Sequence, residues 1–468
     1  MVKIRKTRII CTLGPATESS EMLRKLLRAG ADVFRLNMSH ARHDWCRDIC
    51  KRIREASEEV GRPVGILFDL QGPSIRTGDL EEKIVLTPGD LVEFRNEGTE
   101  PGLEKSTTMN YPGLMSDVHE GDQLAVDNGE LLLKIREIKE DCLIAEVVTA
   151  GEMGSRRHIN LPGVRLKLPA LTEKDRADIK VAAECQADFL AGSFVRDAAH
   201  VRELRETIRA EGCEAEIVSK LEDQEAIRQL DHIIRESDII MVARGDLGIE
   251  VHVEELPIIQ RRIVKRCHQL GRRVIVATHM LESMIESPTP TRAEVTDVSN
   301  AVFEEADAIM LSGETTVGRH PIRCVELMDR VARRIERSGG LGYGKEATLD
   351  SERQKIIQAA CGLADSIPNS LLVVFTRSGK TAHQTALLRP RAPMFAFTPQ
   401  SSLCSRFTLS RGVRSFKVVF EEDPKGTIAA AVDFLRHKYE LEKMTPIIVV
   451  SVNQREGQAV DRIIVEHS

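Results

Sequence analysis

Short runs of apolar, largely β-branched residues recur through the first 340 residues of the chain. Runs of this kind are typical of strands that are buried on both faces of a parallel sheet. The eight clearest runs cover residues 7–15, 33–40, 65–72, 189–194, 216–222, 239–248, 273–281 and 308–314.

Amphipathic helical patterns lie between most of these runs, and their ends carry the expected capping residues. Thr17 is a candidate N-cap and Gly30 a candidate stop for the first helix, and Gly61 follows the second. The patterns cover residues 17–29, 43–60, 172–186, 197–210, 223–236, 255–270, 291–305 and 321–337. Eight strand–helix units predict a (β/α)8 TIM barrel, and a doubly wound open sheet is the alternative.

The regular alternation of strand and helix patterns is interrupted between the third and fourth apolar runs. Residues 73–168 contain turn signals such as TPGD and VDNGE, separated by short alternating strand-like runs, which predicts a small inserted all-β domain. A Gly-rich stretch at 337–348 reads as a linker, and helix and strand patterns alternate after it. The predicted domains are a discontinuous barrel (1–72 and 169–338), the insert (73–168) and a C-terminal α/β domain (345–468).

Composition narrows the class of protein. The chain has 66 Lys plus Arg against 72 Asp plus Glu, so a globally basic nucleic-acid binder is excluded. Aromatic residues make up 4%, which argues against a base-stacking surface. The ten cysteines form no CxxC pair and suit a reducing cytosol. Neither an apolar leader nor a membrane-spanning run is evident, so we expect a cytoplasmic protein without membrane partners.

Polar and charged residues close most of the predicted strands. In TIM barrels the catalytic groups sit at these carboxyl ends, so the residues should converge on one mouth. They are Arg35, Asn37, Ser39, His40, Asp69, Lys220, Glu222, Arg244, Gly245, Asp246, Thr278, Ser312 and Glu314. Individual structural alternatives exist: Glu222 in the first turn of a helix, Asp246 in a turn, and Arg35 paired with Asp69.

The chemistry of these residue types is specific. Glu222 and Asp246 offer hard oxygen ligands suited to Mg²⁺ or Mn²⁺ shared with a substrate. Lys220 supplies a point charge where negative charge develops. The arginines that suit phosphate clamps are Arg35, Arg76 and Arg157. Together these residues predict phosphoryl transfer, which depends mostly on positioning and charge neutralisation.

The motifs that hold these residues resemble those of pyruvate kinase over the whole chain. They are CTLGPAT (11–17), RLNMSH (35–40), DLQGPSIRTG (69–78), VDNG (126–129), NLPG (160–163), SKLED (219–223), MVARGDLGIE (241–250), ATHMLESMIESPTPTRAEVTDV (277–298), MLSGET (310–315) and RPRAP (389–393). The resemblance implies a TIM barrel with an inserted β-barrel lid and a C-terminal α/β regulatory domain, assembled as a homotetramer. It also implies transfer of phosphate from phosphoenolpyruvate to ADP, giving pyruvate and ATP.

The same resemblance implies roles for single residues. Glu222 and Asp246 match the divalent-metal ligands, and Lys220 matches the lysine that stabilises the transferring phosphoryl group and the enolate. The backbone at Gly245 and Asp246, together with Thr278, matches the site of the substrate carboxylate. The remaining matches are Arg35 (substrate phosphate), Ser312 (proton transfer to the enolate), Asn37, His40, Arg76 and Arg157 (nucleotide phosphates), and Asn37, Ser39, Asp69 and the Leu70 carbonyl (a K⁺ site).

The chain departs from the family's potassium-dependent pattern, DTKGPEIRTG. Leu70, Gln71 and Ser74 replace Thr, Lys and Glu, and Ser74 removes a carboxylate that would favour a nearby cation. We therefore expect little or no need for K⁺. Arg157 replaces the usual lid Lys, keeping the charge with a different geometry. His279 stands where the family often has Gln, and we interpret it as a hydrogen-bonding residue rather than a catalyst.

The loop at 376–384 resembles the family's effector-phosphate loop. Its hydroxyls, its lysine and a helix N-terminus suit an anion, which favours a sugar-phosphate activator. The residues concerned are Thr376, Ser378, Gly379, Lys380 and Thr381. A plain loop-to-helix turn is the alternative. Residues 452–460 lack the Trp- and Gly-rich lid of some relatives, which disfavours fructose 1,6-bisphosphate and leaves a monophosphate as the alternative.

Two other classes of function compete with the phosphotransferase. A catalytically silent regulator would have lost a metal carboxylate or the lysine, but Glu222, Asp246 and Lys220 are all present. A metal-dependent lyase or aldolase acting on enolates needs no ADP clamp, so Arg76 and Arg157 speak against it.

Overall fold

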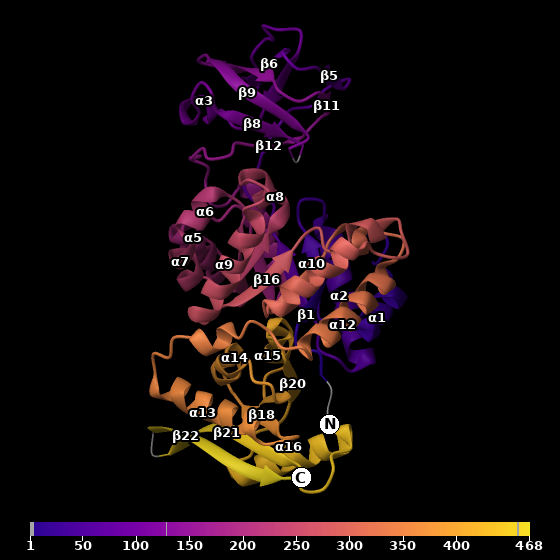
Figure 1. Cartoon of the computed structure of the whole chain (residues 1–468), viewed down its shortest axis with the longest axis vertical. Helices are drawn as coiled ribbons and strands as arrows, with labels where there is room; N and C mark the ends of the chain where they lie inside the picture. The colour runs from indigo at the N-terminus through magenta and orange to yellow at the C-terminus, as the bar shows by residue number, and fades with distance from the viewer. Residues whose placement is uncertain (1–3, 128, 456–457) are drawn as a thin grey trace.

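Eight parallel strands close into a barrel in the middle of the molecule (Figure 1). The computed structural model describes residues 4–127, 129–455 and 458–468, and the side chains of all of these except 452–455 and 458–461. The barrel strands are β1 (Arg8–Thr12), β2 (Val33–Asn37), β3 (Gly65–Asp69), β13 (Phe189–Gly192), β14 (Glu216–Leu221), β15 (Ile239–Ala243), β16 (Arg273–Ala277) and β17 (Ala308–Leu311). β1 pairs with both β2 and β17, which closes the ring and confirms the TIM barrel over the open sheet.

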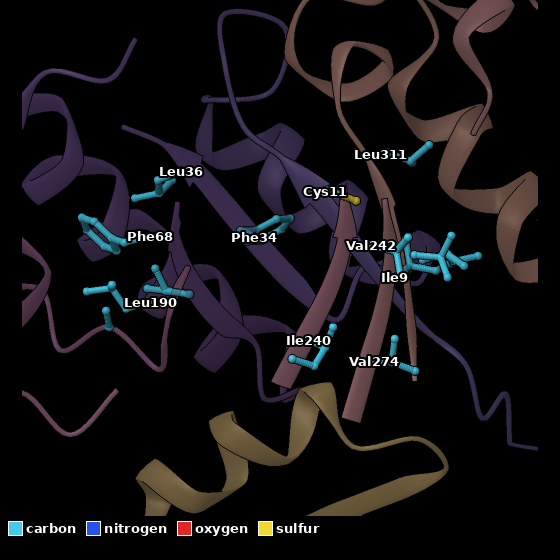
Figure 2. Close-up of a cluster of buried hydrophobic side chains, with 14 of the residues drawn as sticks. Ile9, Cys11, Phe34, Leu36, Phe68, Leu190, Ile240, Val242, Val274 and Leu311 are labelled. Atoms are coloured by element: carbon cyan, nitrogen blue, oxygen red, sulfur yellow. The ribbon is translucent and has the colours of Figure 1, made fainter. Parts of the chain in front are cut away.

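Both faces of the barrel strands are buried, as their continuous apolar runs predict. In β1, Ile9 and Cys11 point outward into the layer between strands and helices, whereas Ile10 belongs to the cluster that fills the barrel interior. Figure 2 shows the outer layer, with Ile9, Cys11 and Phe34 among its labelled side chains. Burial on both faces leaves the carboxyl ends of the strands as the place where polar side chains gather.

The helices surround this barrel, and most of them begin and end close to the residues predicted from the sequence. They are α1 (Ser20–Ala29), α2 (His43–Val60), α4 (Glu173–Glu184), α5 (Ala198–Ala210), α6 (Gln224–Arg228), α7 (Leu230–Glu236), α9 (Leu256–Gln269), α10 (Arg292–Phe303) and α12 (Pro321–Glu336). The predicted helix at 223–236 is thus two helices, α6 and α7. The predicted N-cap Thr17 is wrong, because its hydroxyl donates to the carbonyl of Thr315 (2.7 Å) and Ser19 caps Met22 instead.

Two predicted strands also end earlier than expected. The run 239–248 becomes a strand only to Ala243, and α8 (Arg244–Glu250) follows at once. The run 308–314 ends at Leu311 and continues as α11 (Gly313–Thr316). These short helices turn the chain away from the barrel mouth directly after the strand, so the residues of both runs stay close to the site.

A recurrent aspartate orders the opposite, amino end of the barrel. In four places an Asp immediately before one strand accepts a hydrogen bond from the backbone N–H of a residue in the neighbouring strand. The pairs are Asp32 with Ile9, Asp188 with Ile66, Asp238 with Ile217, and Asp307 with Val274, at 2.8–3.0 Å. Each bond fixes the register of two adjacent strands.

The inserted residues form an all-β unit beyond the barrel mouth (top of Figure 1). Its strands are β4 (Ile75–Arg76), β5 (Ile84–Leu86), β6 (Leu91–Asn96), β7 (Ser106–Met109), β8 (Gln123–Val126), β9 (Leu131–Ile138), β10 (Cys142–Val147), β11 (Gly151–Met153) and β12 (His158–Asn160), with helix α3 (Leu114–Asp117). The seven-stranded sheet runs β4-β12-β8-β9-β10-β6-β7. A bridge between Thr77, next to β4, and Met109 of β7 joins its two edges, so the sheet curls back on itself as a small barrel.

The C-terminal unit is a separate α/β layer structure below the barrel in Figure 1. Its elements are α13 (Glu352–Ser366), β18 (Leu371–Phe375), α14 (Lys380–Leu387), β19 (Met394–Thr398), α15 (Ser401–Arg406), β20 (Val413–Lys417), α16 (Pro424–Tyr439), β21 (Pro446–Arg455) and β22 (Gln458–His467). The sheet order is β20-β19-β18-β21-β22, with β22 antiparallel. The predicted linker holds one short 3₁₀ turn (Tyr343–Glu346).

The C-terminal unit plugs the amino end of the barrel. Leu409 packs into the apolar cluster of the barrel interior. Arg389 forms a bidentate ion pair with Asp307 (2.6 and 2.7 Å), both nearly inaccessible to solvent. The contact between the two units is therefore a buried interface rather than a loose tether. In the described part of the chain, no helix is long and apolar enough to cross a membrane.

Candidate active site

A cavity of about 380 Å³ lies at the carboxyl ends of the barrel strands, facing the inserted unit. The sequence-predicted residues that line it are Arg35, Asn37, Ser39, His40, Leu70, Arg76, Arg157, Lys220, Glu222 and Asp246. Three other predicted residues, Asp69, Gly245 and Thr278, do not line it. Asp69 pairs with the lining residue Lys220, and Gly245, which precedes the lining residue Asp246, is hydrogen-bonded to Thr278. The strand-end argument therefore brought together residues that are far apart in the sequence.

Lys220 is held at the centre of this cavity by partners on both sides. Its ammonium nitrogen lies 2.9 Å from Glu222 Oε1 and 3.3 Å from Asp69 Oδ1, and it donates to Ser193 Oγ at 2.6 Å. Burial alone would lower the pKa of Lys220, but the two carboxylates outweigh it and raise the pKa above its ordinary value. The side chain is therefore a fixed positive charge at neutral pH.

Arg35 makes the structural pair that was the alternative to a substrate role. Its Nε donates to Asp69 Oδ2 at 2.6 Å, and its Nη1 donates to Thr12 Oγ1 at 3.0 Å. Burial favours the neutral form of Asp69, but Lys220 and Arg35 prevail and lower its pKa. Arg35 still lines the cavity, so the ion pair orients the guanidinium rather than withdrawing it.

Glu222 and Asp246 face the same cavity from the ends of neighbouring strands, β14 and β15. Glu222 is almost fully buried, and burial followed by the charge of Asp246 raises its pKa, against the opposing effect of Lys220. Asp246 is about one-third exposed. Among the described residues no cluster of three or more His, Cys, Asp or Glu side chains could hold a metal. Mg²⁺ needs only one or two protein carboxylates when substrate and water fill its other positions, so the pair fits this ion.

The start of α8 is fixed by Thr278 in a left-handed conformation (φ 67°). Its hydroxyl accepts from the backbone N–H of Gly245 (2.8 Å), and Arg244 donates to the carbonyl of Thr278 (2.6 Å). Non-glycine residues in this region of backbone space are strained, and they persist only where the surroundings hold them. These contacts hold the backbone of Gly245 beside the cavity. His279 is exposed and lies 3.8 Å from Glu282.

The inserted unit contributes three arginines to the cavity wall, Arg76, Arg156 and Arg157. Arg76 donates to Ser74 Oγ (3.2 Å) and to the carbonyl of Arg156 (3.1 Å). Arg157 pairs with Asp127 at 3.1 Å. The guanidiniums of Arg76 and Arg157 therefore share one cavity with the charged residues of the barrel.

Three of the four residues predicted for a monovalent cation, Asn37, Asp69 and Leu70, have oxygens that contact protein groups. Asn37 Oδ1 accepts from the N–H of Ser39 (3.2 Å), and the carbonyl of Leu70 accepts from Ser193 Oγ (2.8 Å). The carboxylate of Asp69 contacts Arg35 and Lys220, as described above. Asn128 of the VDNG motif lies outside the described residues.

Ser312 and the effector residues do not line this cavity. Ser312 ends β17 with a buried hydroxyl that has no hydrogen-bond partner among the described residues. Four of the effector residues (Thr376, Ser378, Lys380 and Thr381) line a different cavity of about 540 Å³, in the C-terminal unit. Gly379 between them adopts φ 84° and precedes α14, but Glu421 and Glu422 also line this cavity. The side chains of 452–460, interpreted above as lacking an effector lid, lie outside those that the structure describes.

Among the cavity residues that sequence reasoning missed, Ser193 and His158 lie next to the central charged groups. Ser193 links Lys220 to the carbonyl of Leu70, and it ends the run 189–194, where the strand-end argument would have found it. His158 lies 3.6 Å from Asp246, and burial together with Arg76 lowers its pKa to about 4, so the ring is neutral at pH 7. It lies in the inserted unit, where no strand-end rule applies, so the sequence held no comparable signal.

Comparison with known proteins agrees with the geometry. Residues 4–325 match the pyruvate kinase barrel domain, and residues 354–463 match the pyruvate kinase alpha/beta domain. The chain belongs to the pyruvate kinase family. Pyruvate kinase from Corynebacterium efficiens is 39% identical over 448 residues, covering 96% of this chain and 94% of the relative. Plastidial pyruvate kinase 2 from Arabidopsis thaliana is 38% identical over 450 residues, covering 95% of this chain and 78% of the relative.

Other pyruvate kinases show a similar degree of likeness. That of Corynebacterium glutamicum is 40% identical over 413 residues, covering 88% of this chain and 86% of the relative. The likeness thus extends over the barrel, the inserted unit and the C-terminal unit, and the membership of the pyruvate kinase family inferred from the motifs is confirmed.

Replacing Asp69 by Asn is expected to lower the free energy of unfolding by about 3–5 kcal/mol, because it leaves two buried cations without their shared carboxylate. Urea denaturation followed by circular dichroism measures the change. Asp79→Asn is the matched control: Asp79 pairs with Arg156 on the surface, and its loss should cost less than about 1 kcal/mol. Equal effects of the two substitutions would contradict a buried charge network at the mouth.

Proposed function

We propose that the chain is a pyruvate kinase that carries out the glycolytic transfer of a phosphoryl group from phosphoenolpyruvate to ADP. A terminal phosphate oxygen of ADP bonds to phosphorus, and the bond from phosphorus to the enol oxygen breaks. The enolate that leaves takes a proton at its terminal carbon and becomes pyruvate. The other product is ATP.

The observation that carries this proposal is the position of Lys220. Its charge is fixed between Glu222 and Asp69, beside Arg35, in a cavity that also holds the lid arginines. Negative charge moves from the phosphoryl group to the enolate oxygen during the reaction, and a preorganised cation stabilises that redistribution without reorganisation. A buried ammonium that is already oriented meets this requirement.

The remaining residues divide the substrates between them. Arg35 is proposed to bind the phosphate of phosphoenolpyruvate, and the backbone of Gly245 and Asp246, positioned by Thr278, to bind its carboxylate. Asn37, His40, Arg76 and Arg157 are proposed to contact the nucleotide phosphates. Mg²⁺ or Mn²⁺ held by Glu222 and Asp246 would supply Lewis-acid charge neutralisation. Ser312, whose hydroxyl is buried and unpartnered in the described structure, is proposed to assist protonation of the enolate from behind the cavity lining.

The two competing classes of function are separated by one assay. Formation of pyruvate from phosphoenolpyruvate is followed with and without ADP and Mg²⁺. The phosphotransferase requires both. A silent regulator yields no pyruvate, and a lyase releases pyruvate from another substrate without ADP.

The strongest single test is Lys220→Met. We expect kcat to fall about a hundredfold or more with a much smaller change in KM, because the charge acts mainly in the transition state. Steady-state kinetics in phosphoenolpyruvate measures both constants, and circular dichroism checks that the variant is folded. A loss confined to KM would place Lys220 in ground-state binding and refute the assigned role.

Activity is expected to need little or no K⁺. Asn37 Oδ1, the Leu70 carbonyl and Asp69 Oδ2 already accept hydrogen bonds from protein donors, and Ser74 supplies no carboxylate. Turnover in K⁺ should therefore stay within about tenfold of turnover in tetramethylammonium, at constant ionic strength. Ser74→Glu should increase the dependence on K⁺. A loss of more than tenfold in the wild-type chain would overturn the proposal.

We also propose that a sugar phosphate binds the loop of residues 376–381 and activates the enzyme. The support is the cavity lined by Thr376, Ser378, Lys380 and Thr381. Lys380→Glu should abolish activation by sugar monophosphates while leaving the unactivated rate unchanged. Lys355→Glu, an exposed substitution on α13 outside this cavity, is the control. An intact response in Lys380→Glu would leave the loop as a plain turn before α14.

Assembly as a homotetramer is part of the same proposal. Large apolar side chains such as Val253, Ile258 and Phe303 are exposed on the barrel, and partner subunits would cover surfaces of this kind.

A further inference from the structure

A second large cavity lies where the barrel meets the C-terminal unit. This junction cavity measures about 590 Å³ and is lined by the start of the chain, the end of α12, and the loops around 365–371, 389–394 and 411–412. It shares no residue with the cavity at the barrel mouth or with the cavity beside the effector loop. Its charged lining includes Lys6, Glu336, Arg337, Asp365, Arg391 and Arg411.

Arg411 is the unusual member of this lining. The residue is only 8% exposed, yet among the described residues its guanidinium has neither a hydrogen bond nor an ion pair, and its Nε is buried without a partner. Asp307 receives only the backbone N–H of Arg411 (3.4 Å), because both its oxygens bind the guanidinium of Arg389. Glu336 and Glu305 act on the charge of Arg411 from farther away, and neither of these described side chains forms an ion pair with it. Burial, followed by the charge of Arg389, lowers the pKa of Arg411.

Lys6 is a second cation without a close carboxylate. Its ammonium donates to the carbonyls of Pro390 (2.9 Å) and Arg391 (3.1 Å). Burial, followed by the charge of Arg411, lowers the pKa of Lys6 to about 8, although Glu336 and Asp365 oppose the shift. Lys6 and Arg411 therefore repel each other across the same cavity.

The acidic residues of the cavity mostly accept backbone N–H groups, and Asp365 also lies 3.7 Å from the guanidinium of Arg391. Glu336 accepts from the N–H groups of Lys6 (2.9 and 3.0 Å) and Thr7 (2.7 Å). Asp365 accepts from the N–H groups of Arg391 (2.7 Å) and Ala392 (2.9 Å). Neither carboxylate contacts the guanidinium of Arg411, and positive charge exceeds negative charge in the lining. Buried charges in folded proteins are nearly always paired, so the lining of this cavity is suited to bind an anion.

We propose that the junction cavity binds a small phosphorylated metabolite, with its phosphate on Arg411 and Lys6. A guanidinium binds two phosphate oxygens at once, and an ammonium adds a point charge beside it. The volume exceeds that of a phosphate ion and falls in the range of small-molecule sites, so an organic group fits beside the phosphate. Because the lining comes from both units, the bound molecule bridges the barrel and the C-terminal unit. The site is additional to the proposed catalytic function and does not depend on it.

Inorganic phosphate is the probe for the first test. Isothermal titration calorimetry is carried out at constant ionic strength on the wild-type chain, Arg337→Glu and Arg330→Glu. Both substitutions reverse one exposed charge near the end of α12, but only Arg337 lines the cavity. We expect Arg337→Glu to weaken phosphate binding at least fivefold and Arg330→Glu to change it less than twofold. Phosphate bound at the other two cavities is common to all three proteins and cancels in the comparison.

Arg411→Gln removes the charge proposed to bind the phosphate and should weaken the binding of inorganic phosphate at least tenfold. Because a buried substitution can disturb folding, crystals of the wild-type chain soaked in tungstate provide an independent measurement. A tetrahedral oxyanion should give an anomalous peak beside Arg411 and Lys6. Equal phosphate affinities in Arg337→Glu and Arg330→Glu, or tungstate peaks only at the barrel mouth and the effector loop, would overturn the proposal.

Discussion

The mouth of the barrel depends on the pairing of charges that cannot reach bulk water. Arg35 on β2, Asp69 on β3, Ser193 just beyond β13 and Lys220 on β14 form a continuous chain of contacts across four neighbouring strands, and Glu222 ends it. Removing one member leaves its neighbour charged and unpaired, which costs far more than a surface ion pair contributes. The same contacts that hold the strands in register therefore hold the reactive groups in place. Stability and reactivity at this end of the barrel are properties of one network.

At the amino end of the barrel, buried charges are also paired, but by different residues. There the aspartates that precede the strands accept backbone N–H groups, and arginines neutralise them, as Arg389 does for Asp307 and Arg54 for Asp188. These four carboxylates are not free for chemistry, because each binds a backbone N–H group and an arginine. A barrel of parallel strands thus separates a structural end from a chemical end, and the C-terminal unit can cover the structural end with Leu409 without obstructing the site.

Apolar periodicity predicted the barrel and the strand ends, because strands buried on both faces leave a continuous pattern and expose polar residues only at their carboxyl ends. This is why Arg35, Lys220, Glu222 and Asp246 could be located from the sequence. The pattern failed where a distant partner decides the local structure. Thr17 resembles an N-cap but bonds to Thr315, which follows the neighbouring strand β17, and His158 reaches the mouth only because the insert folds over it. The recurrent aspartate before strands, in GADVF, QADFL, ESDII and EADAI, was a signal in the sequence that had not been recognised.

The requirement that buried charges be paired also distinguishes the junction cavity from the rest of the molecule. At the mouth, Lys220 has two carboxylates; at the amino end, Arg389 has both oxygens of Asp307. Arg411 is equally buried and has neither, although it follows Ser410, whose carbonyl binds Arg8, in a well-packed segment of the interface. The guanidiniums of Arg35 and Arg389, which are of comparable burial, bind carboxylates, whereas that of Arg411 faces a cavity. The unpaired charge of Arg411 is better explained by a reversibly bound anion than by packing. Because the site spans the barrel and the C-terminal unit, binding of that anion would influence both units.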